Sequence, residues 1–257
     1  MIGKFLAAGR TADIYEWETG YVLKLFHTWM PLEDIEYEFR MAQAVHSSGL
    51  APLVKPMIEH DGRTGLIYER VAGHSMFEIF KGSIWKIYGL AQRMADMHFQ
   101  LHQSRIESSL PPLKLKLERK LQNASALPTS LQQRLIEKLA DFPDGDRICH
   151  GDFHPGNIML DGADGKIIDW IDASRGNPLA DVARTSILLL GAVSTFPNPF
   201  LRMTITWFHA VYLKRYFSLH KSGEAEYKLW LPIVAGARLS ERIPELEPWL
   251  LEQAQKI

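Results

Sequence analysis

Residues 150–157 read HGDFHPGN, and residues 167–170 read IIDW. The first run predicts a turned loop, because its two glycines and its proline oppose a regular helix. It carries a carboxylate, Asp152, five positions before an amide, Asn157. The second run carries another carboxylate, Asp169, directly after a short apolar stretch that is typical of a strand. Together the two runs predict that three oxygen-bearing side chains lie on one loop and its neighbouring strand.

These side chains are of the kinds that phosphoryl transfer requires. One carboxylate orients and deprotonates the attacking hydroxyl, while an amide oxygen and a second carboxylate hold Mg²⁺ against the phosphates. The interval between Asp152 and Asn157 equals that of the protein-kinase catalytic loop, H-R-D-x-x-x-x-N, and Asp169 follows a strand as the Asp of the D-F-G motif does. An isolated Asp beside Gly is usually a turn residue. The joint occurrence favours the catalytic interpretation.

Residues 1–70 predict an antiparallel sheet interrupted by one helix. The helix starts near Pro31, where Glu33 and Asp34 suit the positive end of the helix dipole, and it ends before Gly49. Strands are indicated by short runs rich in Ile, Val, Leu, Tyr and Trp, separated by turn dipeptides at 19–20 and 61–62. The predicted strands span residues 4–7, 12–18, 21–26, 53–59 and 64–69.

From Ser75 onward the apolar pattern is helical. The first long helix has Trp85, Leu90, Met94, Met97 and Leu101 on one face, and further helices are predicted at 113–124, 129–140, 179–190, 201–219, 226–239 and 245–255. The predicted fold class is α+β and bilobal: a small antiparallel-sheet lobe over residues 1–70, followed by a larger, mainly helical lobe over residues 71–257.

Composition narrows the functional classes. The 257 residues are 46% hydrophobic and carry a formal net charge of -1, so no overall basic field exists to bind nucleic acid or an anionic membrane. No uninterrupted apolar run approaches the 18 residues expected of a membrane span. The single cysteine, Cys149, excludes an intramolecular disulfide and favours a reducing compartment. We therefore expect a cytoplasmic protein with neither nucleic-acid nor membrane partners. Oligomeric state is left open.

The loop and the Ile168–Trp170 segment resemble signatures of the aminoglycoside phosphotransferase and choline kinase-like family, as does GNPLADVA at residues 176–183. Members of this family are small-molecule kinases with a protein-kinase-like fold. The resemblance implies ATP or GTP and Mg²⁺ as cofactors. It also implies that the substrate is a small-molecule alcohol, such as an aminoglycoside or an amino alcohol.

The resemblance also assigns individual roles. Asp152 would be the catalytic base, Asn157 and Asp169 the magnesium ligands, and Lys24 the contact to the α- and β-phosphates, with Glu38 as its partner. Further nucleotide contacts would come from a phosphate-covering loop and from a hinge at the lobe boundary: Gly9 and Thr11, and Glu69 and Val71.

Two alternative functions remain at this stage, an atypical protein serine/threonine kinase and a non-catalytic nucleotide-binding module. Trp170 replaces the Phe-Gly of protein kinases and His154 replaces a lysine, and both changes favour a small-molecule acceptor. The presence of Lys24, Asp152 and Asn157 argues against the non-catalytic module.

Other side chains have competing interpretations. His98 and His102 are four residues apart and could hold a metal, but core packing is the preferred reading. Asp181 is expected to brace the loop, and Cys149 to be a small buried apolar residue. Two groups could favour a cationic substrate, or could simply be core and solvated surface. They are the aromatic set Trp207, Phe208, Tyr212, Tyr216, Phe217, Trp230 and Trp249, and the acidic set Glu224, Glu226, Glu241, Glu245 and Glu247.

Overall fold

The computed structural model describes residues 2–82, 84–105 and 110–257, and the chain divides into two compact units. The first unit is Met1–Ser75 with Asn157–Ile171, and the second is Met76–Gly156 with Asp172–Ile257. The division differs from the expected boundary at residue 70, which left residues 157–171 in the second lobe. These residues group with the first unit because their hairpin pairs with a strand at 74–75, and because Ile167 N donates to Leu50 O at 2.8 Å.

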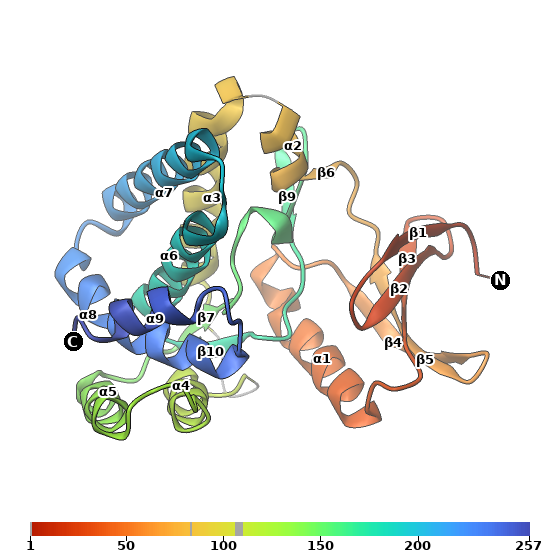
Figure 1. Ribbon diagram of the computed structural model, residues 1–257. Coiled ribbons are helices and arrows are strands. Elements are labelled where there is room, and N and C mark those ends of the chain that lie inside the picture. Colours follow the sequence, from red (N-terminus) through yellow and green to blue (C-terminus); the bar gives the residue numbers. More distant parts are fainter. Residues whose placement is uncertain (1, 83, 106–109) are drawn as a thin grey trace. The chain divides into compact units, whose positions relative to one another are not determined.

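A five-stranded antiparallel sheet and one helix, α1 (Leu32–Val45), form most of the first unit (Figure 1). The strand order is β1-β2-β3-β5-β4, so β3 lies in the centre. The expected strands are present with shifts of one or two residues at their ends. Their bounds are Phe5–Ala8, Ala12–Glu16, Tyr21–Phe26, Val54–His60 and Arg63–Glu69 for β1 to β5.

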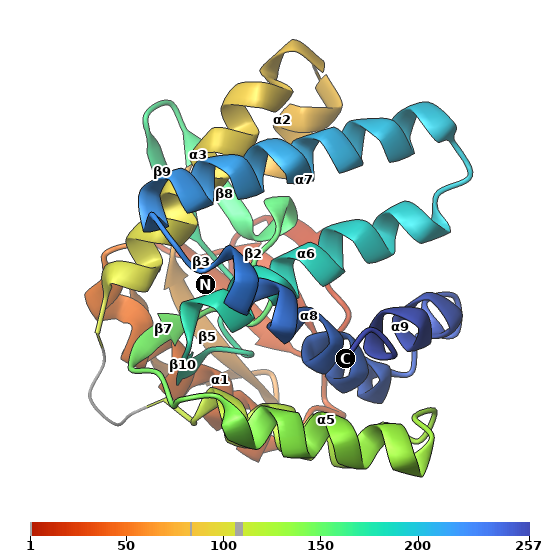
Figure 2. The ribbon, with the colours of Figure 1, turned by 90° about the vertical axis from the view of Figure 1, so that its left-hand side faces the viewer.

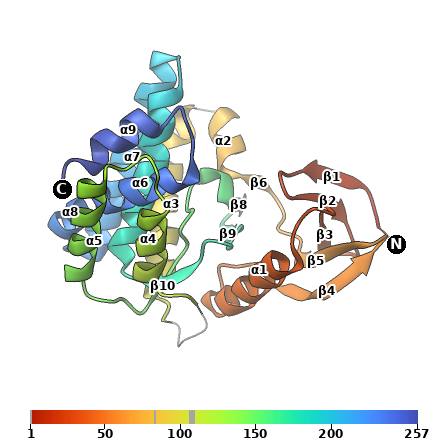
Figure 3. The same cartoon turned by 60° about the horizontal axis from the view of Figure 1, so that its bottom comes forward.

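The alternation of side chains along β3 gives the sheet two packed faces. Leu23 and Leu25 point to one face, where Ile67 joins them. Phe26 points to the opposite face and packs with Ile35 of α1. Helix α1 lies along this second face and contacts β4 and β5 (Figure 3). Lys24 shares the parity of Phe26 and therefore points to the side that α1 covers.

A small three-stranded sheet completes the first unit. It consists of β6 (His74–Ser75), β8 (Ile158–Asp161) and β9 (Asp164–Ile167), with β8 in the middle. The pairing of Ile158 with Ile167 closes the open end of the β8–β9 hairpin, and Ile168 N donates to Asn157 O at 2.9 Å. The residue before β8 and the residues after β9 are thereby held side by side.

Helices dominate the second unit. Helix α3 packs along α7, and α6 packs against both α7 and α8 (Figure 2). A two-stranded sheet of β7 (Arg147–Cys149) and β10 (Ser174–Gly176) flanks the loop at 150–157. The bounds of α2 to α9 are Met76–Gly82, Ile87–Gln103, Leu113–Gln122, Thr129–Asp141, Pro178–Thr195, Pro199–His220, Glu224–Arg238 and Glu247–Ala254. None of the helices in the described ranges is long and apolar enough to cross a bilayer.

Local sequence explains where the long helices begin. The side-chain oxygen of Asn177 accepts from Leu179 N at 2.9 Å, and Pro178 occupies the first helical position of α6. Asn198 caps α7 in the same way. One helical expectation was wrong: Trp85 lies in a 3₁₀ turn before α3 and is 92% exposed, so the packed face of the helix starts after it.

Candidate active site

A buried ion pair marks the centre of the first unit. Lys24 Nζ donates to Glu38 Oε1 at 2.6 Å, and the hydroxyl of Tyr68 donates to the same oxygen at 3.0 Å. Lys24 comes from the central strand and Glu38 from the inner face of α1, where it is 5% exposed. Burial, together with the Glu38 charge, raises the pKa of Tyr68 well above its ordinary value, so the phenol keeps its proton. The expected pairing of Lys24 with Glu38 is present.

Lys24 and Glu38 line a cavity of about 500 Å³ that lies within the first unit. One wall comes from Ile14 of β2 and Val22 of β3, apolar residues next to Lys24: Ile14 pairs with Lys24 across the two strands. Another wall is the segment Tyr68–Val71, which comprises the end of β5 and the two residues after it. A cavity of this size with apolar walls and a few convergent polar groups suits a small-molecule ligand. The remaining lining residues include Ala42, Met159, Ile168 and Trp170.

Asn157 and Asp169 line the same cavity. The β8–β9 hairpin brings them together, because one precedes its first strand and the other follows its second. Asp169 has φ of +64°, a left-handed conformation that costs about 1 kcal/mol or more for a residue other than glycine. An amide oxygen and a carboxylate beside an ammonium group are a donor set that fits Mg²⁺ with a bound polyphosphate.

The four other candidate nucleotide-binding residues differ in whether they line this cavity. Glu69 and Val71 line the cavity, whereas its lining, taken over the described residues, does not include Gly9 or Thr11. Those two residues lie in the turn between β1 and β2, where Gly9 N donates to Ala12 O at 2.8 Å. The turn therefore lies next to residues of β1 and β2 that line the cavity.

Asp152 belongs to the second unit and lies in a cationic environment. Its carboxylate is 3.4 Å from His154 Nε2 and 4.0 Å from Arg184 Nη2. Burial alone would raise the pKa of Asp152, but the hydrogen bond and charge of His154, with the charge of Arg184, outweigh it and lower the pKa to about 2. Asp152 is therefore ionised at neutral pH.

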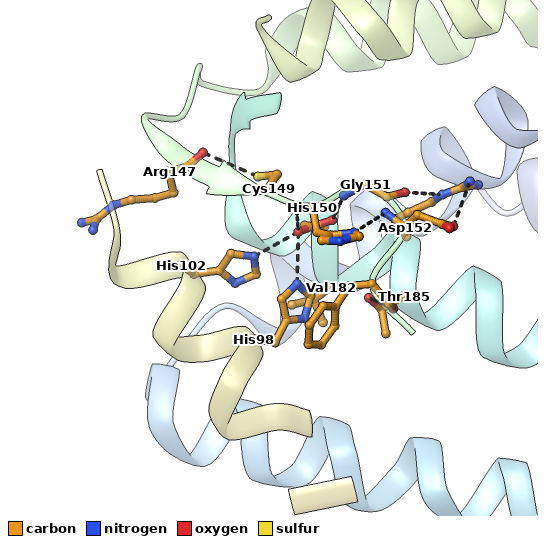
Figure 4. A network of polar contacts seen from close by, with 12 residues as sticks. His98, His102, Arg147, Cys149, His150, Gly151, Asp152, Val182 and Thr185 are labelled. Carbon is orange, nitrogen blue, oxygen red and sulfur yellow. Dashed lines mark hydrogen bonds and ion pairs between the residues drawn. The ribbon is translucent and has the colours of Figure 1, made fainter. Parts of the chain in front are cut away.

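The loop that carries Asp152 is anchored on Asp181. Figure 4 shows the polar network in which His150 and Gly151 of this loop lie, with His98 and His102 on a neighbouring helix. Asp181, in the first turn of α6, accepts from His150 N at 2.6 Å and from Gly151 N at 2.8 Å. Gly151 has φ of +81°, and a Cβ there would lie 2.5 Å from the carbonyl oxygen of Asp172. Glycine is thus required at this position both by backbone conformation and by space.

His98 and His102 complete the environment of Asp181. Their Nε2 atoms lie 3.1 and 3.3 Å from Asp181 Oδ2, and their Nδ1 atoms lie 2.7 Å from the hydroxyls of Tyr212 and Tyr216. The ligand atoms of these three residues are close enough to hold a metal ion. Nevertheless, every nitrogen has a protein partner and two backbone N–H groups already bind the carboxylate, so the arrangement is a satisfied hydrogen-bond network.

The protonation states fit this network. Burial lowers the pKa of His98 to about 3 and also lowers the pKa of His102, so both rings are neutral. Burial opposes ionisation of Asp181, yet the hydrogen bonds from His102 and His98 dominate and hold its pKa well below the ordinary value. One carboxylate therefore remains charged in the core because four donors converge on it.

Burial decides between the competing interpretations of Cys149 and of the aromatic set. Cys149 is fully buried, and desolvation raises the pKa of its thiol well above the ordinary value, so it behaves as a small apolar residue. In the aromatic set, Phe208, Tyr212, Tyr216 and Trp230 are buried core residues. A cage of exposed rings for a cationic ligand is therefore not formed by these four.

The fold and the site are those of a kinase-like α+β protein. A lysine of the central strand pairs with a glutamate of α1, the second unit is helical, and one loop carries Asp and Asn five positions apart. The sequence profile of the phosphotransferase enzyme family matches residues 2–217, and the chain belongs to this family. No curated protein sequence matches the chain.

Solved structures share its fold at low sequence identity. One is a thermostable mutant of aminoglycoside phosphotransferase APH(4)-Ia in a ternary complex with AMP-PNP and hygromycin B: TM-score 0.70, 15% identity, covering 100% of this chain and 93% of that chain. Another is a choline/ethanolamine kinase family protein from Mesorhizobium loti: TM-score 0.63, 15% identity, 100% and 87% coverage. A third is amicoumacin kinase hAmiN with AMP-PNP, Ca²⁺ and Ami: TM-score 0.60, 18% identity, 99% and 89% coverage. These similarities confirm the predicted fold class.

Proposed function

We propose that this protein transfers the γ-phosphoryl group of ATP, with Mg²⁺, to a hydroxyl of a small molecule. The observation that carries the proposal is the convergence of Lys24, Asn157 and Asp169 on one cavity. Family membership supports a phosphotransferase, and the nucleotide complexes of structural neighbours support ATP as donor. The roles of individual residues and the use of Mg²⁺ are our inference from chemistry.

In this proposal the first unit binds the nucleotide. The adenine lies between the apolar side chains of β2 and β3 and the Glu69–Val71 segment, whose backbone offers hydrogen bonds. Lys24, oriented by Glu38, donates to the α- and β-phosphates. Asn157 and Asp169 would hold Mg²⁺, which would neutralise part of the phosphate charge.

Asp152 activates the acceptor. Its carboxylate is ionised, and it accepts the hydroxyl proton as the oxygen attacks phosphorus. A base with a pKa near 2 is weak, so its main contribution is to orient the hydroxyl and to receive the proton late in the reaction. Most of the rate enhancement is therefore assigned to positioning and to electrostatic stabilisation.

The test is a phosphorylation screen with the purified protein, radiolabelled ATP, Mg²⁺ and a pool of small alcohols. The expected result is a labelled small molecule, with ADP released in equal amount. The same reaction with Asp152→Asn should lose transfer by a factor of ~10³ or more and retain nucleotide binding. Retention of most of the activity by Asp152→Asn would remove Asp152 from the role of base.

Two further arms separate the alternatives. Peptide libraries replace the alcohol pool in one arm, and robust labelling of serine or threonine there would favour a protein kinase. The other arm replaces ATP with GTP, and a higher kcat/KM with GTP would change the donor. Since ATP and Mg²⁺ are abundant in the cytoplasm, the proposal includes a cytoplasmic location.

A further inference from the structure

A second, smaller cavity lies within the second unit, next to the loop that carries Asp152. Its volume is about 30 Å³, room for roughly two water-sized groups. Gly151 and Asp172 form part of its wall, and the rest comes from α4, α6 and α8. Four cationic side chains line it: Lys116 and Lys120 from α4, Arg184 from α6, and Arg238 from the end of α8.

The carboxylates around this cavity are shared unevenly among its cations. Lys116 and Lys120 approach Asp172 Oδ1 at 3.3 and 3.4 Å. Arg184 donates to Glu241 Oε1 at 2.6 Å, and Lys120 lies 3.7 Å from the same atom. Asp181 also lines the cavity, but its carboxylate accepts from His150 N and Gly151 N. With Asp152, 4.0 Å from Arg184, the carboxylates are as many as the cations, so the cluster is distinguished by a cation that lacks hydrogen-bond acceptors and not by its formal charge.

Arg238 is the cation of this cluster that lacks hydrogen-bond acceptors. The residue is 9% exposed, and its Nε and Nη1 atoms are buried without a hydrogen-bond acceptor among the described residues. Glu241 Oε2 lies 3.5 Å from Nε but does not form a hydrogen bond with it. A buried guanidinium with unpaired N–H groups is costly, and it indicates a missing acceptor.

The pKa shifts in the cluster reflect burial and the mutual repulsion of its cations. Burial, together with the charge of Arg184, lowers the pKa of Arg238 to about 10, although Glu241 and Asp152 act in the opposite direction. Burial also lowers the pKa of Lys116, and the charges of Lys120 and Arg184 lower it further, against the effect of Asp172. An added anion would relieve this repulsion.

We propose that the acceptor of this phosphotransferase is a short hydroxy acid, whose carboxylate binds between Arg238 and the α4 lysines while its hydroxyl meets Asp152. The proposal rests on the function proposed above and names its substrate class. Arg184 connects the two ends of such a molecule, because it donates to Gly151 O at 3.0 Å and also lines the cavity. The cavity has room for the two oxygens of a carboxylate, whereas a phosphate group requires more.

The acidic residues that suggested a cationic substrate do not oppose this. Glu241 is engaged by Arg184, and Glu226 accepts from Asn177 at 2.7 Å and from Trp230 at 3.3 Å. The other three, Glu224, Glu245 and Glu247, are exposed to solvent. A polycationic acceptor would offer no acceptor to the unpaired N–H groups of Arg238.

The test measures kcat/KM for matched acceptors, with ADP release as the readout. Short hydroxy acids such as glycerate and homoserine are compared with their methyl esters, with sugar phosphates and with aminoglycosides. The expected result is turnover of at least one hydroxy acid, with its ester at least tenfold poorer. Turnover of only esters, amino alcohols or aminoglycosides would overturn the inference and leave the proposed function intact. Turnover of sugar phosphates alone would overturn the assignment of a carboxylate.

Two variants locate the carboxylate. Lys120→Met and Arg238→Gln should each raise KM for the acid by roughly 10- to 100-fold, because a charge-assisted hydrogen bond is lost, and should leave KM for ATP nearly unchanged. Lys228→Met, on the exposed side of α8, is the matched control. If Arg238→Gln fails to fold, Lys120→Met decides. Equal loss for acid and ester in Lys120→Met would contradict the site, and no phosphorylation of any alcohol would contradict the proposed function itself.

Discussion

Lys24 and Glu38 are joined at 2.6 Å, from the central strand of the sheet to the helix that covers it. Their side chains are 19% and 7% exposed. In this setting the ammonium group is held toward α1, and the shared acceptor oxygen is also bound by Tyr68. The position of the ammonium group therefore depends on the packing of α1.

Glu38→Gln tests this dependence. The amide can still accept from Tyr68, but it no longer attracts the lysine charge, so Lys24 should lose its orientation toward the cavity. We expect kcat/KM for ATP to fall by roughly 10- to 100-fold, in line with the loss of one charge-assisted hydrogen bond. Steady-state kinetics at varied ATP would measure it. Glu36→Gln on the outer side of α1 serves as control, and equal effects of the two changes would refute the role of the pair.

Asp169→Asn separates charge from backbone conformation. Asparagine tolerates a left-handed conformation nearly as well as aspartate, so the loop should keep its shape while one negative ligand is lost. We expect the stabilisation of the protein by ADP to lose its dependence on Mg²⁺. Thermal unfolding with ADP, with and without Mg²⁺, provides the measurement. The exposed Asp161→Asn should behave like the unmodified protein, and a retained magnesium effect in Asp169→Asn would exclude Asp169 as a ligand.

Asp181→Asn addresses the network under the catalytic loop. The amide presents a donor where the carboxylate accepted, so at least one of the four donors, from His98, His102, His150 or Gly151, is left buried and unpaired. The free energy of unfolding should fall by ~3 kcal/mol. Urea unfolding would measure this loss, with the exposed Asp141→Asn as control. A change below ~1 kcal/mol would show that the network contributes little.

The stability of the protein should also fall on acidification. His209 is 8% exposed, and burial lowers its pKa from 6.5 to about 4. Between these pH values the unfolded chain binds the proton and the folded chain does not, so stability is greatest above about pH 6.5 and decreases toward pH 4. His98, with a pKa lowered to about 3, acts in the same direction.

Variants at two histidines isolate this effect. His209→Gln should flatten the pH dependence of the free energy of unfolding by up to ~1.4 kcal/mol per pH unit in that window. The exposed His46→Gln should leave it unchanged. Urea unfolding between pH 4 and pH 7 gives both slopes. An unaltered slope in His209→Gln would mean that the ring is not excluded from protonation in the folded state.

Much of the first unit could be predicted from sequence because its signals are local. Alternating apolar residues and turn dipeptides define β2 to β5, and Pro31 with its acidic neighbours marks the start of α1. The loop at 150–157 could be singled out because its candidate catalytic and metal-binding side chains lie within eight consecutive residues. Trp85 was misplaced because an apolar residue at the correct helical interval cannot reveal that the helix begins after it.

Other parts of the site depend on contacts between distant residues. Tyr68 reaches Glu38 across thirty positions, and Arg184 reaches Glu241 across fifty-seven. No interval in the sequence encodes these pairs. The basic cavity combines residues from three helices, each of which carries ordinary surface-like lysines or arginines when read alone. The cavity can be recognised only when the burial and the charge of these residues are considered together in the folded structure.

The anchoring of the loop on Asp181 has a consequence for genetics. Support reaches the loop from α3 through His98 and His102, and from α7 through Tyr212 and Tyr216, none of which meets a substrate in the proposed reaction. A library of random substitutions selected for loss of phosphorylation should thus yield many hits along these two helices. The positions of these substitutions would identify the residues that support the loop. Conservative exchanges such as Tyr212→Phe should reduce activity partly and in a temperature-sensitive way.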